Sequence, residues 1–273
     1  MAKSIAELQT IAKIVRRDII QMITAAKSGH PGGSLSAVEL VVDLYFNHMK
    51  IDPANPKWAD RDRFILSKGH AAPVLYSVMA EIGYADAPKD RLNTLRQFGS
   101  VFQGHPDMRF IPSLEASTGS LGQGLSLGLG MALGARLNAS PSRTFVMLGD
   151  GEIQEGQVWE AAMAAAFMKA DNLVAIVDNN RIQLDGFVKD IMAIDPLGEK
   201  WRSFGWHVIE LDGHDFAAIE SALSEAAATK DKPTCLIAHT VKGKGVSFME
   251  NNPKFHGMAP TADECKLALQ ELN

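Results

Sequence analysis

The stretch RTFVMLGDG at residues 143–151, together with LVAIVDNN at residues 173–180, predicts the fold of this chain of 273 residues. The apolar runs Arg143 to Leu148 and Leu173 to Val177 are typical of strands buried on both faces, and residues 155–169 between them have the pattern of a helix. A right-handed crossover makes two strands connected in this way parallel. We therefore expect an α/β fold with a largely parallel sheet flanked by helices.

Asp150 and Asn180 each follow one of these strands, and residues 152–178, 27 in all, separate the GDG motif from the NN motif. Because parallel strands end at one edge of a sheet, where α/β proteins bind ligands, we expect the two side chains to converge. One carboxylate and one amide oxygen suit Mg²⁺ or Ca²⁺, whose other positions are filled by water and ligand phosphates. Gly-Asp-Gly alone is a common turn, but the spaced pair of motifs indicates a site for a phosphorylated cofactor.

The composition argues against several classes of protein. The formal net charge is −5 and the 27 Lys and Arg residues are scattered, so we expect neither nucleic acid nor a membrane surface as a partner. The N-terminus lacks an apolar signal region, and no stretch approaches the roughly 18 unbroken apolar residues of a spanning helix. Cys235 and Cys265 form no disulfide or metal-binding pattern, which favours packing roles in a reducing compartment. We therefore expect a soluble, cytoplasmic protein.

The chain is long enough for one large α/β domain or two small ones. Because no linker, repeat or low-complexity stretch interrupts it, we expect a single domain over residues 1–273. Ser4 with Glu7, and Thr261 with Glu264, have the spacing of a capping box at the start of a helix. The first of these helices should present one apolar face to the core, formed by Ile5, Leu8, Ala12, Val15, Ile19 and Met22.

Five of the eight histidines adjoin a glycine, which permits the tight loops that often carry functional side chains. Imidazole can bind sugar hydroxyls and exchange protons with them near neutral pH, although a loop histidine is more often a turn or capping residue. We apply that plainer interpretation to His214, which precedes an expected helix, and a structural one to His48, His207 and His239. The candidates for catalysis are His30, His70, His105 and His256.

The motifs around these four histidines resemble those of the transketolase family, which uses thiamine diphosphate. They read SGHPGG at 28–33, SKGHA at 67–71, QGHPD at 103–107 and FHG at 255–257. The GDG and NN motifs resemble the thiamine diphosphate fingerprint, and STGSLGQG at 117–124 resembles the cofactor loop of the family. The resemblance covers nearly the full chain. The family usually has proline where Ser120 stands, a change that removes no chemical group.

The resemblance implies a thiamine diphosphate-binding fold, with residues 1–273 as the diphosphate-binding domain. The side-chain oxygens of Asp150 and Asn180 and the carbonyl of Ile182 would hold the divalent metal, Mg²⁺ or alternatively Ca²⁺ or Mn²⁺. Glu155 and Glu160 match an acidic pair that lies near the subunit interface in the family. The residues implied to contact the cofactor are His70, Gly119, Leu121, Gly151, Glu155, Asn180 and His256.

The implied activity is transfer of a two-carbon ketol unit from a ketose phosphate to an aldose phosphate, with the cofactor as electron sink. The four candidate histidines would line the substrate side and hold hydroxyls or carry small proton transfers, a role worth about 10²- to 10⁴-fold in rate. In the family a glutamate from a second domain activates the cofactor, whereas this sequence stops soon after the FHG motif. We therefore expect the N-terminal subunit of a split transketolase. Its partner would be a C-terminal subunit with the pyrimidine-binding and C-terminal domains, in an α2β2 complex.

Two other interpretations are open at this point. The chain could be another thiamine diphosphate enzyme, such as deoxyxylulose-phosphate synthase or the alpha subunit of a 2-oxo acid dehydrogenase, or it could be a non-catalytic cofactor-binding chain. The histidine motifs favour transketolase over both. A dinucleotide loop is not indicated, because residues 122–128 have the spacing GxGxxxG and no strand pattern precedes them. Glycines at 124, 128, 130 and 134 suggest close packing of a helix against the cofactor or a neighbouring subunit.

Overall fold

The computed structural model describes residues 2–184 and 186–273. Its centre is a five-stranded sheet of order β1-β2-β3-β7-β6, in which every neighbouring pair of strands is parallel. The strands are β1 (Arg63–Leu66), β2 (Thr144–Gly149), β3 (Leu173–Asn179), β6 (His207–Asp212) and β7 (Thr234–His239). A short antiparallel hairpin of β4 (Ile182–Gln183) and β5 (Gly186–Phe187) follows β3. The expected α/β fold with a parallel sheet is confirmed.

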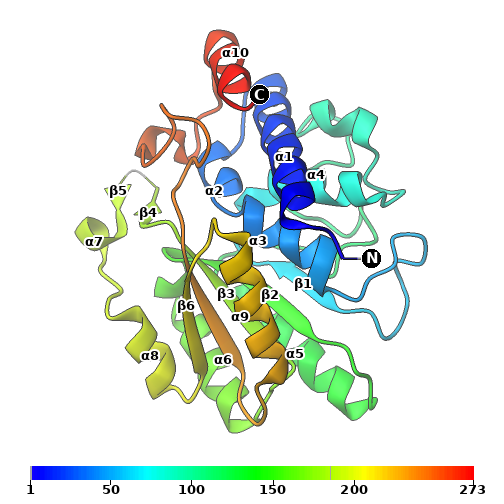
Figure 1. Cartoon of the computed structure of the whole chain (residues 1–273), viewed down its shortest axis with the longest axis vertical. Coiled ribbons are helices and arrows are strands. Elements are labelled where there is room, and N and C mark those ends of the chain that lie inside the picture. The colour runs from blue at the N-terminus through cyan, green and yellow to red at the C-terminus, as the bar shows by residue number, and fades with distance from the viewer. Residues whose placement is uncertain (1, 185) are drawn as a thin grey trace.

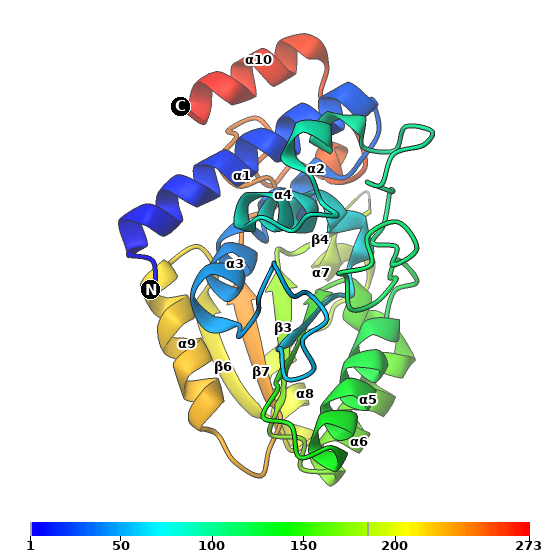
Figure 2. The same ribbon diagram turned by 90° about the vertical axis from the view of Figure 1, so that its right-hand side faces the viewer.

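Helices cover both faces of this sheet (Figure 1). Figure 2 shows α3 and α9 on one side and α5 and α6 on the other, with α1, α4 and α10 beyond one end of the strands. The helices are α1 (Ile5–Ala26), α2 (Pro31–Leu35), α3 (Val38–Asp43), α4 (Ala72–Ile82), α5 (Gln123–Leu137), α6 (Gly156–Phe167), α7 (Val188–Ile191), α8 (Leu197–Ser203), α9 (Phe216–Ala228) and α10 (Ala262–Glu271).

The central strands are buried on both faces, as their apolar runs predict. Alternate side chains of β2 belong to different cores: Phe145 and Met147 pack with α1, α3 and α9, whereas Val146 and Leu148 pack with α5 and α6. All residues of β2 and β3 are buried. The observed β2, α6 and β3 differ from the predicted strand, helix and strand by at most two residues at each end, so the predicted βαβ unit is confirmed.

Both predicted capping boxes are present. Ser4 Oγ accepts from the Glu7 N–H at 3.3 Å while the Glu7 carboxylate accepts from the Ser4 N–H at 2.8 Å, and Thr261 and Glu264 repeat this arrangement at the start of α10. The predicted apolar face of α1 is buried except at Ile5, which is 42% exposed. The expectation for Ile5 is wrong because residues 2–7, where α1 begins, are all exposed.

Only two of the four glycines in α5 pack closely. A side chain at Gly124 would collide with Ser67, and one at Gly128 would collide with Val146 of β2. Among the described residues, and leaving aside the backbone of α5 itself and the adjoining residues, no atom lies within 4 Å of where a Cβ would stand at Gly130 or Gly134. The first pair therefore packs within the chain, whereas packing of this helix against the cofactor or a neighbouring subunit stays a prediction.

Cys235 is buried in β7 and Cys265 is partly buried in α10, and both are free thiols, in keeping with packing roles. Within the described part of the chain, no helix has both the length and the apolar character that crossing a membrane requires.

Candidate active site

A cavity of about 350 Å³ lies where the loops after β2 and β3 meet, at the carboxyl edge of the sheet. Every residue that the sequence motifs assign to metal, cofactor or substrate lines it: His30, His70, His105, Gly119, Leu121, Asp150, Gly151, Glu155, Asn180, Ile182 and His256. A wider depression of about 840 Å³ shares His30 and His256 with this cavity. The predicted convergence of these segments is confirmed, while the individual roles stay predictions.

Three residues with oxygen atoms that could bind a metal lie at one end of the cavity. The buried carboxylate of Asp150 accepts from the Gly151 N–H at 2.8 Å and from the Arg181 N–H. The side-chain oxygen of Asn180 accepts from the Ile182 N–H at 3.2 Å, which directs this amide by a local turn. Ile182 also lines the cavity, so the residues expected to supply the donors are brought together in the folded chain.

These donors fit a divalent metal that also binds a ligand phosphate. Burial, followed by the charge of Asp178, raises the pKa of Asp150 to about 6, so the carboxylate lacks full charge compensation from the chain. Among the described residues, no group of three or more His, Cys, Asp or Glu could hold a metal. One carboxylate with two neutral oxygens is an incomplete set of hard ligands, which phosphate oxygens and water would complete.

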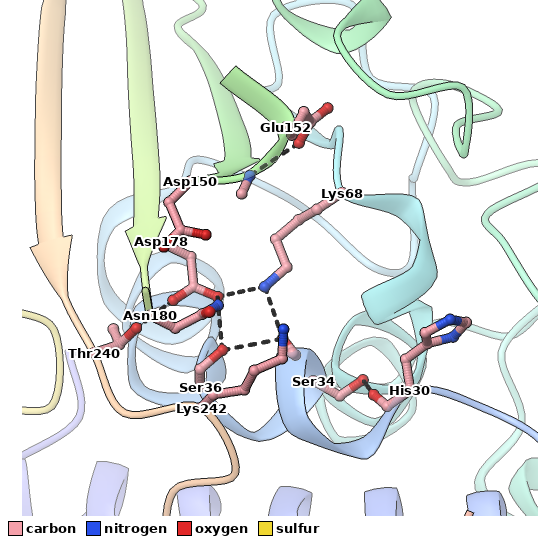
Figure 3. A network of polar contacts seen from close by, with 12 residues as sticks. His30, Ser34, Ser36, Lys68, Asp150, Glu152, Asp178, Asn180, Thr240 and Lys242 are labelled. Atoms are coloured by element: carbon pink, nitrogen blue, oxygen red, sulfur yellow. Dashed lines mark hydrogen bonds and ion pairs between the residues drawn. The ribbon is translucent and has the colours of Figure 1, made fainter. Parts of the chain in front are cut away.

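Asp178, the last residue but one of β3, forms a buried ion pair with Lys68 that the sequence motifs did not reveal (Figure 3). The carboxylate also accepts from Ser36 Oγ at 2.6 Å, from Thr240 and from Asn180 Nδ2 at 3.2 Å. Burial alone would raise the pKa of Asp178, but Lys68 and the hydrogen bonds outweigh burial and the pKa is lowered. Asp178 is therefore a charged anchor at the strand end and is not free to bind a metal.

Lys242 is the second cation that the sequence motifs did not reveal. Its Nζ donates to the Ile182 carbonyl and to His256 Nδ1, each at 2.7 Å. Burial, followed by the charge of Lys68, lowers the pKa of Lys242 to about 8. Two buried ammonium groups beside the oxygen donors make this end of the cavity suitable for a diphosphate. Lys68 lies within the SKGHA motif, directly before Gly69 and His70, and this position in the sequence could have indicated that it belongs to the site.

Three of the four candidate histidines form a cluster. The ring centroids of His30 and His70 are 5.2 Å apart, and each lies 5.5 Å from that of His256. Burial, followed by nearby cations, lowers the pKa of His30 to about 4 and of His256 to about 3, and it lowers the pKa of His70 and His105 as well. These rings are therefore neutral at pH 7, and a neutral imidazole can both donate to and accept from a sugar hydroxyl.

Arg96 supports this cluster, and no motif pointed to it. Its Nη1 donates to Ser28 Oγ at 2.7 Å, and its Nη2 lies 3.4 Å from both His30 Nδ1 and the Gly104 carbonyl. Since arginine is always a donor, His30 Nδ1 is the acceptor and its hydrogen is on Nε2. Arg96 thus orients His30 and the loop that carries His105.

Gly119 must be glycine for a geometric reason. Its φ is +134°, and a Cβ there would come within 2.8 Å of the His105 ring. The buried Glu152 holds the neighbouring loop, because its carboxylate accepts from the Gly122 N–H at 3.0 Å and the Gly149 N–H at 2.9 Å. Glu152 therefore joins the predicted cofactor loop to the GDG motif.

The remaining histidines have polar partners within the chain, whereas an interface role for Glu155 and Glu160 stays a prediction. Glu155 lines the cavity and is exposed, as is Glu160. The histidines expected to be structural each pair with a carboxylate: His48 with Asp43 at 3.1 Å, His207 with Glu225 at 2.7 Å and His239 with Glu210 at 3.4 Å. His214 is also structural, but it bonds to distant residues and does not cap α9, whose N-cap is Asp215.

The sequence matches the family described as transketolase, thiamine diphosphate binding domain, over residues 7–273. The chain therefore belongs to the transketolase family and contains its thiamine diphosphate-binding domain. Transketolases use this cofactor with a divalent metal ion, so the expected cofactor is confirmed.

Two relatives of similar length are named as subunits of transketolases. The chain is 43% identical, over its full length and 98% of the relative, to a 6-deoxy-6-sulfo-D-fructose transketolase subunit of Clostridium sp. (strain MSTE9). It is 41% identical, over 94% of its length and 91% of the relative, to an apulose-4-phosphate transketolase subunit of Phocaeicola vulgatus.

Solved transketolases share the fold. The transketolase of Campylobacter jejuni superposes with a TM-score of 0.94 at 32% identity over 99% of this chain. The chain spans 43% of the length of that protein. It thus corresponds to an N-terminal transketolase subunit, and the interpretation as a transketolase-type transferase subunit is favoured over the other thiamine diphosphate enzymes considered.

Proposed function

We propose that the chain is the N-terminal subunit of a split transketolase that uses thiamine diphosphate and Mg²⁺ to transfer a two-carbon ketol unit between sugar phosphates. The observation that carries this proposal is the division of the cavity into two ends. One end has three oxygen donors and two buried lysines, and the other has four histidines with lowered pKa. Such a cavity suits a metal-bound diphosphate at one end and a neutral polyol at the other.

At the first end, Asp150, Asn180 and the Ile182 carbonyl would hold the metal, and Lys242 would face the diphosphate. Gly151 has Gln183 against it, so that a Cβ at position 151 would come within 2.7 Å of that side chain. A side chain at residue 151 would therefore displace Gln183, which also lines the cavity, and we propose that glycine leaves room there for the phosphates. When bound, thiamine diphosphate supplies an electron sink for cleavage of a carbon–carbon bond next to a carbonyl.

At the second end, the chain's residues would bind, orient and move protons. His30, whose hydrogen is on Nε2, would donate to a substrate oxygen, while Arg96 keeps that tautomer. His70 and His256 would contact both substrate and diphosphate, because they lie between His30 and the lysines. His105 would hold a further hydroxyl beside Gly119. His30, His70 and His256 are partly buried whereas His105 is exposed, so exclusion of water from the reacting carbons would depend on the partner subunit that covers this end.

We propose a ketose phosphate as donor and an aldose phosphate as acceptor. The names of the two related subunits both specify sugars with a terminal anionic group, a sulfonate in one and a phosphate in the other. A screen should therefore include ketose phosphates, a sulfonated ketose and pyruvate. Turnover of pyruvate alone would favour the deoxyxylulose-phosphate synthase or 2-oxo acid dehydrogenase alternatives over transketolase.

We also propose that residues 1–273 fold as one diphosphate-binding domain and that this domain functions in an α2β2 complex in the cytoplasm. The partner would be a C-terminal subunit with the pyrimidine-binding and C-terminal domains. Large apolar side chains exposed on α5, α6 and the cofactor loop support a covering chain; they are Leu121, Leu127, Met163 and Phe167. Glu155, which is exposed beside the cavity, and Glu160, which is exposed on α6, are candidate interface residues.

Reconstitution tests this function. The purified chain should show no ketol transfer alone and should gain it when the product of the adjacent gene is added. Sedimentation of the mixture should give two copies of each chain. Full activity from the single chain, or no gain with any candidate partner, would favour a non-catalytic binding role instead. Tight binding of thiamine diphosphate in excess chelator would contradict the assigned metal site.

A further inference from the structure

A buried polar network lies behind residues 240–245, the loop that carries Lys242. Arg16 of α1 pairs with Glu39 of α3 at 2.6 Å. His214, in the loop between β6 and α9, has Nδ1 at 3.0 Å from the same carboxylate. Arg16 and Glu39 are only 6% and 7% exposed, and His214 is partly buried, although all three residues line a surface depression of about 310 Å³. No residue of this network lines the cavity described above.

Both ends of the network bind the backbone of that loop. The Val241 N–H donates to His214 Nε2 at 2.8 Å, and Arg16 Nε donates to the Lys244 carbonyl at 3.0 Å. Lys242 and Gly243 are the two residues between these anchors. Three segments that are far apart in the sequence therefore meet at the loop, and each contributes one member of the network.

The geometry also determines the protonation of His214. Because Nε2 accepts from a backbone N–H, it carries no hydrogen, so Nδ1 carries the hydrogen and donates to Glu39. Arg16 in turn holds the Glu39 carboxylate. A carboxylate that fixes the tautomer of a histidine, which then orients another group, is the arrangement by which outer residues orient metal ligands.

The position of the Lys242 ammonium depends on this backbone. Its Nζ is 2.7 Å from both the Ile182 carbonyl and His256 Nδ1. Metal binding at the Ile182 carbonyl would replace the first contact, so the reach of the ammonium toward the diphosphate depends on where the backbone of residue 242 is held. Gly243 has a φ of +81° and donates to the Gly32 carbonyl at 3.0 Å, and a Cβ at residue 243 would collide with the backbone of Met249. The loop thus has little freedom apart from what its anchors allow.

We propose that Arg16, Glu39 and His214 are positioning residues that set the place of Lys242 at the diphosphate end of the cavity. The inference rests on the proposed function, because that function makes Lys242 a ligand of the diphosphate. Stability alone does not require such a network, since apolar side chains of similar volume often replace buried ion pairs without loss. What apolar replacements would lose is the directional hold on residues 241 and 244.

The experiment compares His214→Leu with His214→Gln, whose amide can still accept from the Val241 N–H. Calorimetry with thiamine diphosphate and Mg²⁺, on the full chain assembled with its partner, should give affinity about 10- to 100-fold weaker for His214→Leu and largely restored for His214→Gln. Amide exchange at Val241 should accelerate in the leucine variant only. His207→Leu, which removes the contact with Glu225, is the matched control and should change neither quantity.

A double-variant cycle decides whether the network acts through Lys242. Lys242→Met should weaken cofactor binding, and adding His214→Leu to it should cause no further loss. A full second loss in the double variant would overturn the proposal, as would unchanged affinity in His214→Leu despite faster exchange at Val241. If His214→Leu folds poorly, Arg16→Lys provides a second test. Lysine keeps a positive charge near Glu39 but lacks the Nε that donates to the Lys244 carbonyl, so cofactor affinity should fall as in His214→Leu, but by less.

Failure of the proposed function has a different signature. If the unchanged complex bound no thiamine diphosphate, the function proposed for the cavity would be wrong. Exchange at Val241 is measured without cofactor, so an unchanged rate in His214→Leu would overturn the network whatever the cavity binds.

Discussion

Replacement of Asp150 by asparagine should stabilise the metal-free chain at neutral pH and at the same time abolish metal-dependent binding of thiamine diphosphate. Asp150 has a pKa of about 6 in the folded chain against its ordinary 3.8, because burial and Asp178 disfavour its charge. Because folding raises the pKa of Asp150, its contribution to the free energy of unfolding is fully present below the pKa of the unfolded chain and is lost as pH rises through the pKa of the folded chain. The loss falls between about pH 4 and pH 6.

The magnitude follows from the two pKa values. Their difference of about two pH units corresponds to about 3 kcal/mol of lost stability at pH 7, of which asparagine would recover nearly all. Asparagine can still accept from the Arg181 N–H, but it loses the bond from Gly151, which costs about 1 kcal/mol because that site is only part-buried. We therefore expect a net gain of about 2 kcal/mol.

Urea unfolding with chelator present, at pH 4 and pH 7, measures this gain. The variant should exceed the unchanged chain at pH 7 and match or fall below it at pH 4, where Asp150 is protonated. Thiamine diphosphate with Mg²⁺ at about 100 times its dissociation constant should stabilise the unchanged protein by about 2.7 kcal/mol and leave the variant unaffected. Equal stability of the two proteins at pH 7 would refute the electrostatic argument, and a ligand-stabilised variant would refute the metal assignment.

Three further predictions concern the rest of the cavity. Alanine at His30 or His105 should lower kcat/KM for the sugar by about 10²- to 10⁴-fold and change cofactor affinity little, whereas alanine at His70 or His256 should lower both quantities. Steady-state kinetics and calorimetry test this prediction, and unchanged kcat/KM in all four variants would falsify it. Diphosphate affinity should fall as pH rises past about 8, because Lys242 then loses its charge, and Lys242→Met should remove that pH dependence. Calorimetry across pH 7 to 9 measures this affinity, and an identical pH profile in both proteins would contradict the role of Lys242. Gly119→Ala should lower the free energy of unfolding by about 1–3 kcal/mol in urea, because of the positive φ at residue 119 and the nearby His105 ring, whereas Gly130→Ala in α5 should raise it by up to about 1 kcal/mol. A Gly119→Ala variant of unchanged stability would show that His105 can move. Loss of partner binding in Gly130→Ala would place that face of α5 at an interface.

The sequence by itself determined the parts of the protein that depend on short segments. The runs RTFVML and LVAIV have the pattern of strands buried on both faces, and Asp150 and Asn180 had to leave the sheet at the same edge, because parallel strands end together. Capping boxes at Ser4 and Thr261 are likewise contacts between residues three apart. The spaced motifs also identified eleven residues that line the cavity, through their resemblance to one family.

Only the tertiary structure decided how these segments are charged and held. Lys68 meets Asp178 across 110 residues, and Arg16 meets Lys244 across 228 residues, which no local pattern encodes. The lowered pKa values of the histidines arise from burial among segments of separate origin. His214 has the local signature of an ordinary turn residue, yet packing of α1, α3 and the loop after β7 gives it partners at both nitrogens. Its part in the fold depends on which segments pack together, and the sequence around it does not specify that packing.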